Sequence, residues 1–233
     1  MGEIGTVLVT GGCSGLGAAT VRAVASAGGR PVVLDKAPPP GGVAEVCAGF
    51  AVVDLADSRA AEAAVRQVAD HGGGLDAVFT AAGTDRCGML ADVPGEEWDR
   101  VVLVNLLGTA AVVRAALPYL RRSHGKVVTC ASTLGLRAVS DATAYCASKF
   151  GVVGFTRALA AETAGEIGVT MLVPGGMHTA FFDEREERYK PPSDAKLNQP
   201  EDVAEAVLFA LRQPAGCEVR ELVVTPSRES SWP

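Results

Sequence analysis

Short apolar runs alternate with helical segments along almost the whole sequence, and this alternation restricts the fold more than any other feature. Each run has the composition expected of a strand buried on both faces. The runs lie at 4–10, 31–34, 50–53, 75–79, 125–132, 169–173 and 219–224. Strands and helices in alternation favour an α/β fold, with a parallel sheet, right-handed crossovers and helices on both faces. A length of 233 residues fits one such domain or two small ones, and since no repeat or linker divides the sequence we expect one, over 1–233.

The first strand leads into a glycine-rich turn. The turn, Thr10-Gly11-Gly12-Cys13-Ser14-Gly15-Leu16-Gly17, is followed by an alanine-rich helical stretch. Glycines let the backbone turn tightly and approach a pyrophosphate, and the N-terminus of the following helix faces the anion. We therefore expect a dinucleotide here, although the pattern also fits a tight strand–helix turn that binds no ligand.

Asp35 closes the second strand, about where an acidic residue hydrogen-bonds the ribose hydroxyls next to adenine. A carboxylate there would repel the 2′-phosphate of NADP, by roughly 4 kcal/mol for unit charges about 4 Å apart near a protein surface. Lys36 could instead bind that phosphate, and Asp35 could be an ordinary turn residue. Because the carboxylate is fixed at the strand end and the lysine is flexible, we expect NAD in preference to NADP.

Further residues of interest also follow expected strands. They are Asp54, the small residues Ala81, Ala82 and Gly83, Ser132, and the segment 174–179. In a doubly wound parallel sheet the ligand lies beyond the carboxyl ends of the strands, so these residues and the glycine turn should meet at one edge. Small residues there would let a cofactor lie against the strand end, or would serve only close packing.

Tyr145 and Lys149 lie four residues apart in a helical stretch, so their side chains leave the same face. An ammonium beside a phenol stabilises the phenolate, by about three pKa units at most. We therefore expect Lys149 to lower the pKa of Tyr145 from about 10, so that the phenol can act as a general acid and base. The pair alone also fits a half-buried ring beside a solvated amine.

Asn105 lies among apolar residues in a long helix expected at 96–120. Asparagine is a mediocre helix former, and a buried amide needs hydrogen-bond partners. The residue therefore has either a role in a site or the role of a satisfied packing amide.

Charge and composition exclude several classes of protein. The net charge of −6 offers no basic face, so we expect no nucleic-acid partner. We see no run of about 18 apolar residues that indicates a membrane span, and the first strand begins too near Met1 to leave room for a signal peptide. The six cysteines and three histidines are scattered without metal-ligand spacing. We expect no metal and no disulfide framework, but free thiols in a reducing cytoplasm.

Residues 180–199 break the alternation. About twenty residues between regular elements is long for a compact domain and is typical of a lid or a disordered segment. Phe181, Phe182 and Tyr189 supply apolar surface that a lid could lay over a substrate, whereas the charged residues between them are typical of a solvated face. We expect a substrate lid over 180–199.

Together these motifs resemble the short-chain dehydrogenases/reductases of the single-domain type, from Thr10 to about Val224. The family's Thr-Gly-x-x-x-Gly-x-Gly turn corresponds to 10–17, its acidic ribose ligand to Asp35, and its Tyr-x-x-x-Lys pair to Tyr145 and Lys149. The resemblance implies a Rossmann-type doubly wound fold with a seven-stranded, mostly parallel sheet in the order 3-2-1-4-5-6-7. The catalytic residues it implies are Asn105, Ser132, Tyr145 and Lys149. The cofactor-binding residues it implies are Gly11, Cys13, Ser14, Gly15, Leu16, Gly17, Asp35, Asp54, Leu55, Ala81, Ala82, Gly83, Tyr145, Lys149, Pro174, Gly175, Met177 and Thr179.

Two positions depart from the family pattern. The family's Asn-Asn-Ala-Gly after the fourth strand is Thr80-Ala81-Ala82-Gly83 here, so we expect that strand end to be stabilised slightly differently. The family's pair of small residues before the active-site loop corresponds to Ala131-Ser132 here, so only one hydroxyl is available. That hydroxyl, of Ser132, lies at the catalytic spacing of thirteen residues before Tyr145.

The implied function is that of an NAD(P)-dependent oxidoreductase that transfers a hydride between the nicotinamide and a small secondary alcohol or ketone. Tyr145 would be the general acid and base, and Lys149 would hold the nicotinamide ribose. Ser132 would orient the substrate oxygen, and Asn105 would position a water that links Lys149 to solvent.

Other functions stay open at this stage. The same fold could serve a non-catalytic cofactor-binding regulatory protein, although the complete set of four site residues counts against this. An NADP-dependent ketoreductase similar to 3-oxoacyl reductases would use Lys36 as its phosphate ligand. The substrate could be a polyol, a hydroxy acid, an acyl thioester or a ring ketone. The family commonly pairs two long helices, here 96–120 and 143–164, which implies a homotetramer or homodimer, with no membrane partner, in the cytoplasm.

Overall fold

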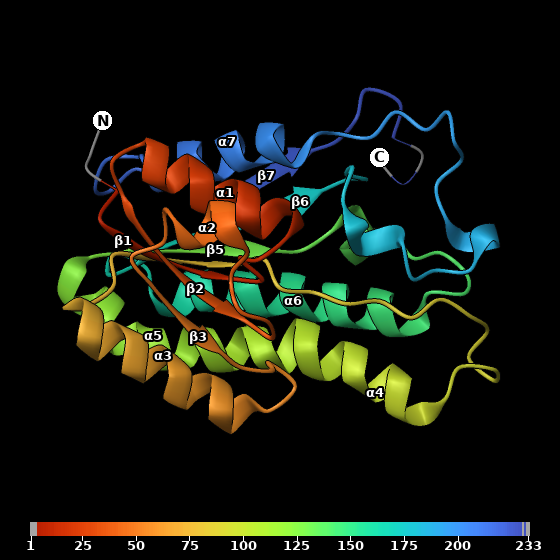
Figure 1. The fold of residues 1–233 in the computed structure, drawn as a ribbon, viewed down its shortest axis with the longest axis horizontal. Helices are drawn as coiled ribbons and strands as arrows, with labels where there is room; N and C mark the ends of the chain where they lie inside the picture. The colour runs from red at the N-terminus through yellow and green to blue at the C-terminus, as the bar shows by residue number, and fades with distance from the viewer. Residues whose placement is uncertain (1–3, 230, 232–233) are drawn as a thin grey trace.

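The computed structural model describes residues 4–229 and 231, and its centre is a sheet of seven strands (Figure 1). The strands are β1 (Thr6–Thr10), β2 (Arg30–Asp35), β3 (Gly49–Val52), β4 (Ala77–Thr80), β5 (Lys126–Cys130), β6 (Gly168–Pro174) and β7 (Glu221–Val224). Their order is β3-β2-β1-β4-β5-β6-β7, as expected, and every pair is parallel. The expectation of a mostly parallel, doubly wound sheet is therefore confirmed.

Helices cover both faces of the sheet, as Figure 1 shows. One face carries α1 (Gly15–Ser26) and α7 (Pro200–Leu211); the other carries α3 (Ser58–Gly72), α5 (Thr109–Ser123) and α6 (Thr143–Glu162). Successive residues of β1 serve the two faces in turn: Val7 and Val9 pack with side chains of α1 and α7, and Leu8 packs with those of α3 and α5. All five residues of β1 are consequently buried, which explains why such strands read as unbroken apolar runs.

A short helix, α2 (Gly41–Ala44), lies between β2 and β3. It forms because the carbonyl oxygen of Pro40 accepts hydrogen bonds from the backbone N–H groups of Val43 and Ala44. Gly41 and Gly42 therefore begin a single helical turn.

The long helix expected at 96–120 is continuous but changes its winding. α4 (Gly95–Val102) passes into a π-helical segment, η1 (Leu103–Gly108), and then into α5. By length and composition alone, Gly95–Ser123 is apolar enough to cross a membrane, contrary to our expectation that no stretch would pass this test. However, 56% of its most apolar window is buried, and α5 packs on α3 and on the sheet. This packing accounts for the apolar residues.

Residues 180–199 contain two short 3-10 turns, η3 (Ala180–Phe182) and η4 (Glu187–Tyr189). A β-bridge between Met177 and Asn198 closes the base of the segment. In Figure 1 the segment lies at the end of the molecule where α4 begins. The expected interruption of the strand–helix pattern is present at this place.

Candidate active site

At Gly11 and Gly17, the glycine-rich turn after β1 has no space for a side chain. A Cβ atom on Gly17 would lie 2.0 Å from the carbonyl oxygen of Gly11. Gly11 has a φ of +65°, and its Cβ would lie 2.8 Å from the Cα atom of Ala82, in the segment after β4. The turn thus presents bare backbone at the start of α1, as a phosphate-binding turn requires.

Asp35 lies beside this turn at the end of β2. Its carboxylate accepts hydrogen bonds from the backbone N–H groups of Cys13 (3.0 Å) and Ala37 (3.2 Å). The acidic side chain is therefore fixed next to the glycine turn, where a ribose-binding carboxylate is expected.

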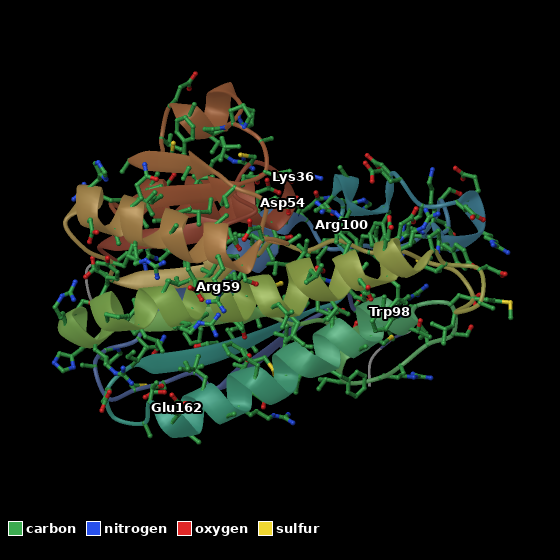
Figure 2. All side chains as sticks on the ribbon, turned by 90° about the horizontal axis from the view of Figure 1, so that it is seen from below. Lys36, Asp54, Arg59, Trp98, Arg100 and Glu162 are labelled. Atoms are coloured by element: carbon green, nitrogen blue, oxygen red, sulfur yellow. The ribbon has the colours of Figure 1, made fainter. Side chains whose placement is uncertain are left out.

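Asp54 follows β3 and is held from two sides. Its carboxylate accepts hydrogen bonds from the backbone N–H of Ala56 (3.0 Å) and from Nη2 of Arg100 (2.8 Å). These bonds hold the pKa of Asp54 below its usual value, and the bond from the backbone of Ala56 has the larger effect. The charge of Lys36 lowers the pKa further. Figure 2 shows Lys36, Asp54 and Arg100 beside one another. Leu55, by contrast, is buried in the core with side chains of α3 and α5.

The segments after β4 and β6 complete this edge of the sheet. A Cβ atom on Gly15 would lie 3.2 Å from Cγ2 of Thr179, so the glycine turn and the segment 174–179 nearly touch. Ala82 donates its backbone N–H to Oγ1 of Thr10 (3.1 Å), which joins the ends of β4 and β1. The bare turn, the fixed carboxylate of Asp35 and these small residues fit a dinucleotide.

The strand end that departs from the family pattern has one unsatisfied group. Within residues 4–229 and 231, Oγ1 of Thr80 is buried and has no hydrogen-bond partner. A threonine hydroxyl thus stands unpaired where the family pattern places an amide side chain. The expected difference in stabilisation from other family members stays a prediction.

The expected catalytic residues meet at the start of α6. Nζ of Lys149 lies 5.6 Å from the centre of the Tyr145 ring and donates a hydrogen bond to the carbonyl oxygen of Cys130 (2.8 Å). The side chain of Ser132 lies close enough to Tyr145 to act on the ionisation of its phenol. All three residues are buried, with Tyr145 only 9% exposed. The helical spacing and the strand-end position therefore bring these groups together as predicted.

The pKa of Tyr145 differs from our prediction. Burial raises this pKa above its usual value, and the side chain of Ser132 opposes the rise only in part. Burial also lowers the pKa of Lys149, because a desolvated ammonium is disfavoured. The prediction that Lys149 lowers the pKa of Tyr145 is wrong for this structure, since the sequence pattern showed the charge pair but not the depth of its burial.

Asn105 lies in the π-helical segment, and its side chain is fully engaged. Nδ2 donates to the carbonyl oxygen of Thr84 (2.8 Å) and to Oγ of Ser148 (3.0 Å), and Oδ1 accepts from the N–H of Thr84 (2.8 Å). Ser148 in turn donates to the carbonyl oxygen of Tyr145 (2.8 Å). The amide therefore ties η1 to the segment after β4 and to α6. The presence of Asn105 in an otherwise apolar helix indicated a site here, whereas nothing in the sequence indicated the π-helical turn.

Sequence reasoning missed two charged residues next to Tyr145. Asp85 follows β4, and Arg185 lies in the segment 180–199; Nη2 of Arg185 lies 2.5 Å from Oδ2 of Asp85. The ring centre of Phe181 lies 5.7 Å from that of Tyr145. The segment 180–199 therefore covers the expected catalytic tyrosine.

A residue near the C-terminus also reaches the expected nicotinamide segment. Oε2 of Glu229 accepts a hydrogen bond from the backbone N–H of Gly176 (2.9 Å), and a Cβ on Gly175 would lie 2.4 Å from the same oxygen. Pro174 ends β6 and Met177 takes part in the bridge to Asn198. No sequence motif indicated the contact with Glu229.

Comparison with known proteins identifies the family. Residues 5–190 match the family model described as short chain dehydrogenase. The chain belongs to the short-chain dehydrogenase family. Membership makes it an oxidoreductase with a nicotinamide-cofactor fold, and the sheet order above is that of a Rossmann-like domain.

Relatives of this short-chain dehydrogenase act on different substrates. It is 31% identical to L-fucose dehydrogenase of Mus musculus, over 97% of this chain and 89% of that protein. It is 33% identical to the (2S)-[(R)-hydroxy(phenyl)methyl]succinyl-CoA dehydrogenase subunit BbsD of Thauera aromatica, over 90% of each. The chain spans only 19% of the length of one further curated relative, and the match to another covers 66% of this chain and 65% of that protein.

The fold also matches solved structures. A short chain dehydrogenase from Burkholderia cenocepacia J2315, crystallised in complex with NADP, superposes with a TM-score of 0.82. The two sequences are 26% identical, and the match covers 96% of this chain and 97% of that one.

Proposed function

We propose that this short-chain dehydrogenase transfers a hydride between C4 of a nicotinamide and the carbon of a small secondary alcohol or ketone. The observation that carries the proposal is the meeting of Ser132, Tyr145 and Lys149 at the sheet edge that also holds the glycine turn and Asp35. The bound nicotinamide would supply the hydride donor or acceptor and, when oxidised, a positive charge.

In this proposal, the protein's side chains transfer the proton, orient the substrate and hold the cofactor. Tyr145 takes the alcohol proton in oxidation and returns it to the developing alkoxide in reduction. Ser132 donates a hydrogen bond to the substrate oxygen and orients it. Lys149 holds the ribose hydroxyls, and Asn105 positions a water that connects Lys149 to solvent.

NAD is the preferred cofactor in this proposal. The carboxylate of Asp35 is fixed beside the glycine turn, where it would accept ribose hydroxyls and repel a 2′-phosphate. Lys36 acts electrostatically on Asp54, in the neighbouring part of the site. An NADP-dependent ketoreductase is the second candidate, favoured by the NADP complex of the Burkholderia cenocepacia protein.

Steady-state kinetics with both cofactors separate these two candidates. We expect the wild-type protein to have a higher kcat/KM with NAD than with NADP, and Asp35→Ala to narrow the difference by raising activity with NADP. Absorbance of the reduced cofactor provides the measurement. A wild-type preference for NADP would contradict the assignment.

Substitution of Tyr145 tests the hydride-transfer proposal itself. Tyr145→Phe removes the proton donor and keeps the ring, so we expect kcat to fall by about 10² or more while the Kd of the cofactor is nearly unchanged. A panel of secondary alcohols and ketones supplies the substrates, and cofactor fluorescence gives the Kd. Near-normal turnover by the Phe variant would refute the role of Tyr145.

We also propose the arrangement of the whole protein. The chain forms one dinucleotide-binding and catalytic domain, with 180–199 as its substrate lid. Two or four copies associate in the cytoplasm through the long helices 96–120 and 143–164. The exposed side chains of Leu107 and Phe150 on η1 and α6 support this pairing.

A further inference from the structure

A buried ion pair joins the segment 180–199 to the segment after β4. Nη2 of Arg185 lies 2.5 Å from Oδ2 of Asp85, and the two side chains are only 17% and 4% exposed. Withdrawing two charges from water is unfavourable, and their mutual attraction offsets that penalty only when the remaining hydrogen-bonding groups are also satisfied. Whether the attraction between Arg185 and Asp85 offsets the desolvation penalty therefore depends on their other hydrogen bonds.

One nitrogen of the Arg185 guanidinium, Nε, makes no hydrogen bond to the described residues. Nη1 donates to the carbonyl oxygen of Tyr189 (3.2 Å) and Nη2 to Asp85, whereas Nε is buried and has no partner within residues 4–229 and 231. Asp85 accepts from the backbone N–H of Arg86 (2.7 Å) and from Sγ of Cys87 (3.3 Å) as well as from Arg185. The pair thus combines a buried unpaired N–H donor with a carboxylate that has room for about one further hydrogen bond.

This pair lies beside the expected catalytic tyrosine. The guanidinium carbon of Arg185 lies 5.4 Å from the ring centre of Phe181 and 4.7 Å from that of Phe182. The Phe181 ring in turn lies 5.7 Å from the ring of Tyr145. The charges of Arg185 and Asp85 both act on the ionisation of Tyr145, which independently places them close to it. A substrate held at Tyr145 would therefore meet a donor, an acceptor and aromatic faces together.

We propose that Arg185 and Asp85 form the substrate-recognition site and select a neutral polyhydroxylated substrate, such as a cyclitol or a sugar in ring form. A hydroxyl next to the reacting carbon would accept a hydrogen bond from Nε of Arg185 and donate one to Asp85. The face of the cyclitol or sugar ring that presents C–H groups would lie against the ring of Phe181. The proposal takes Tyr145 as the reacting position, and in this it rests on the proposed function.

Charge balance distinguishes this substrate class from the others. Arg185 and Asp85 already neutralise each other, so a substrate carboxylate would add an uncompensated charge next to Asp85 in a buried place. A simple alcohol without further hydroxyls would leave Nε unpaired, which is unfavourable for a buried donor. A neutral hydroxyl satisfies the donor and leaves the charge balance unchanged.

The conservative variant Arg185→Lys tests the contribution of the unpaired Nε–H donor separately from that of the positive charge. Lysine keeps a positive charge opposite Asp85 but has no N–H at the Nε position. We would use isothermal titration of NAD-saturated protein with cyclitols and aldohexoses, with the matching uronates, and with cyclohexanol, and would follow turnover of the same compounds. Arg188→Lys is the matched control, since Arg188 lies on the same segment with a 67% exposed side chain.

We expect the wild-type protein to bind a neutral polyol more tightly than the matching uronate or cyclohexanol. Arg185→Lys should raise the polyol Kd by about tenfold to a hundredfold, with the Kd of NAD unchanged. Arg188→Lys should change neither constant by more than about twofold. A preference for uronates or cyclohexanol, absence of polyol binding, an unchanged polyol Kd in Arg185→Lys, or an equal loss in Arg188→Lys would each overturn the proposal.

The two readouts also separate this inference from the proposed function. Polyol binding that depends on Arg185 without hydride transfer would refute the proposed function and support the recognition site. Oxidation of other alcohols, with no effect of Arg185→Lys on the polyol Kd, would support the proposed function and refute the recognition site.

Discussion

Burial sets the properties of individual side chains at the site more strongly than neighbouring charges do. It raises the pKa of Tyr145 and lowers that of Lys149, so the isolated pair is held towards its neutral forms. Cys13, in the glycine turn, shows the same order of effects. Burial first, and then the charge of Asp35, raise the pKa of its thiol to about 12.

The raised pKa makes Cys13 a slow nucleophile. Because the folded protein favours the thiol up to about pH 12, only about one molecule in ten thousand is a thiolate at pH 8. We expect iodoacetamide to modify Cys13 much more slowly than the exposed Cys217, and the rate at Cys13 to rise about tenfold per pH unit between pH 8 and 10. Peptide mass spectrometry measures both sites. Equal rates at pH 8 would contradict the prediction.

At the scale of elements, the close approach of η1 and α6 depends on a glycine. A Cβ on Gly151 would lie 2.6 Å from Cδ2 of Leu106, within the clash range. We expect Gly151→Ala to lower the free energy of unfolding by about 1 kcal/mol, because the cost of overpacking this contact exceeds the gain from alanine's better helix propensity. Urea unfolding gives the value.

Gly72→Ala is the control for that substitution. Gly72 ends α3, and a Cβ there would meet no atom within 4 Å. Since alanine is the better helix former, we expect this variant to be as stable as the wild-type protein or slightly more stable. A loss in Gly72→Ala as large as that in Gly151→Ala would show that the effect is not due to the contact with Leu106.

Which elements could be predicted from the sequence depends on how local their causes are. Buried parallel strands are continuous apolar runs, so β1 and the strand order followed from the sequence pattern and the family resemblance. The π-turn around Asn105 could not be predicted, because one extra residue per turn scarcely alters the apolar periodicity. The four expected catalytic residues carry local motifs. Asp85 and Arg185 carry none, since their pairing spans 100 residues and depends on how the segment 180–199 folds back.

At the scale of the whole molecule, two exposed apolar side chains mark the proposed pairing face. Leu107 on η1 and Phe150 on α6 are each 45% exposed. We expect Phe150→Asp to shift the sedimentation coefficient from that of a dimer or tetramer towards that of a smaller species, because a charge would be buried without a partner. Phe50→Asp is the control, since Phe50 lies on β3 and is 52% exposed. A monomeric wild-type protein would refute the assembly.

The bridge at the base of the segment 180–199 gives the molecule a modular character. His178 donates its backbone N–H to the carbonyl oxygen of Asn198 (2.9 Å), and Asn198 donates to that of Gly176 (3.0 Å). These bonds fix both ends of the intervening chain to one point at the end of β6. We therefore expect replacement of the residues between them to leave the sheet in place, although Thr179 and Phe181 contact the glycine turn and Tyr145. Under the proposed function, substrate choice would diverge by exchange of this one segment, while the residues proposed for hydride transfer come from other parts of the chain.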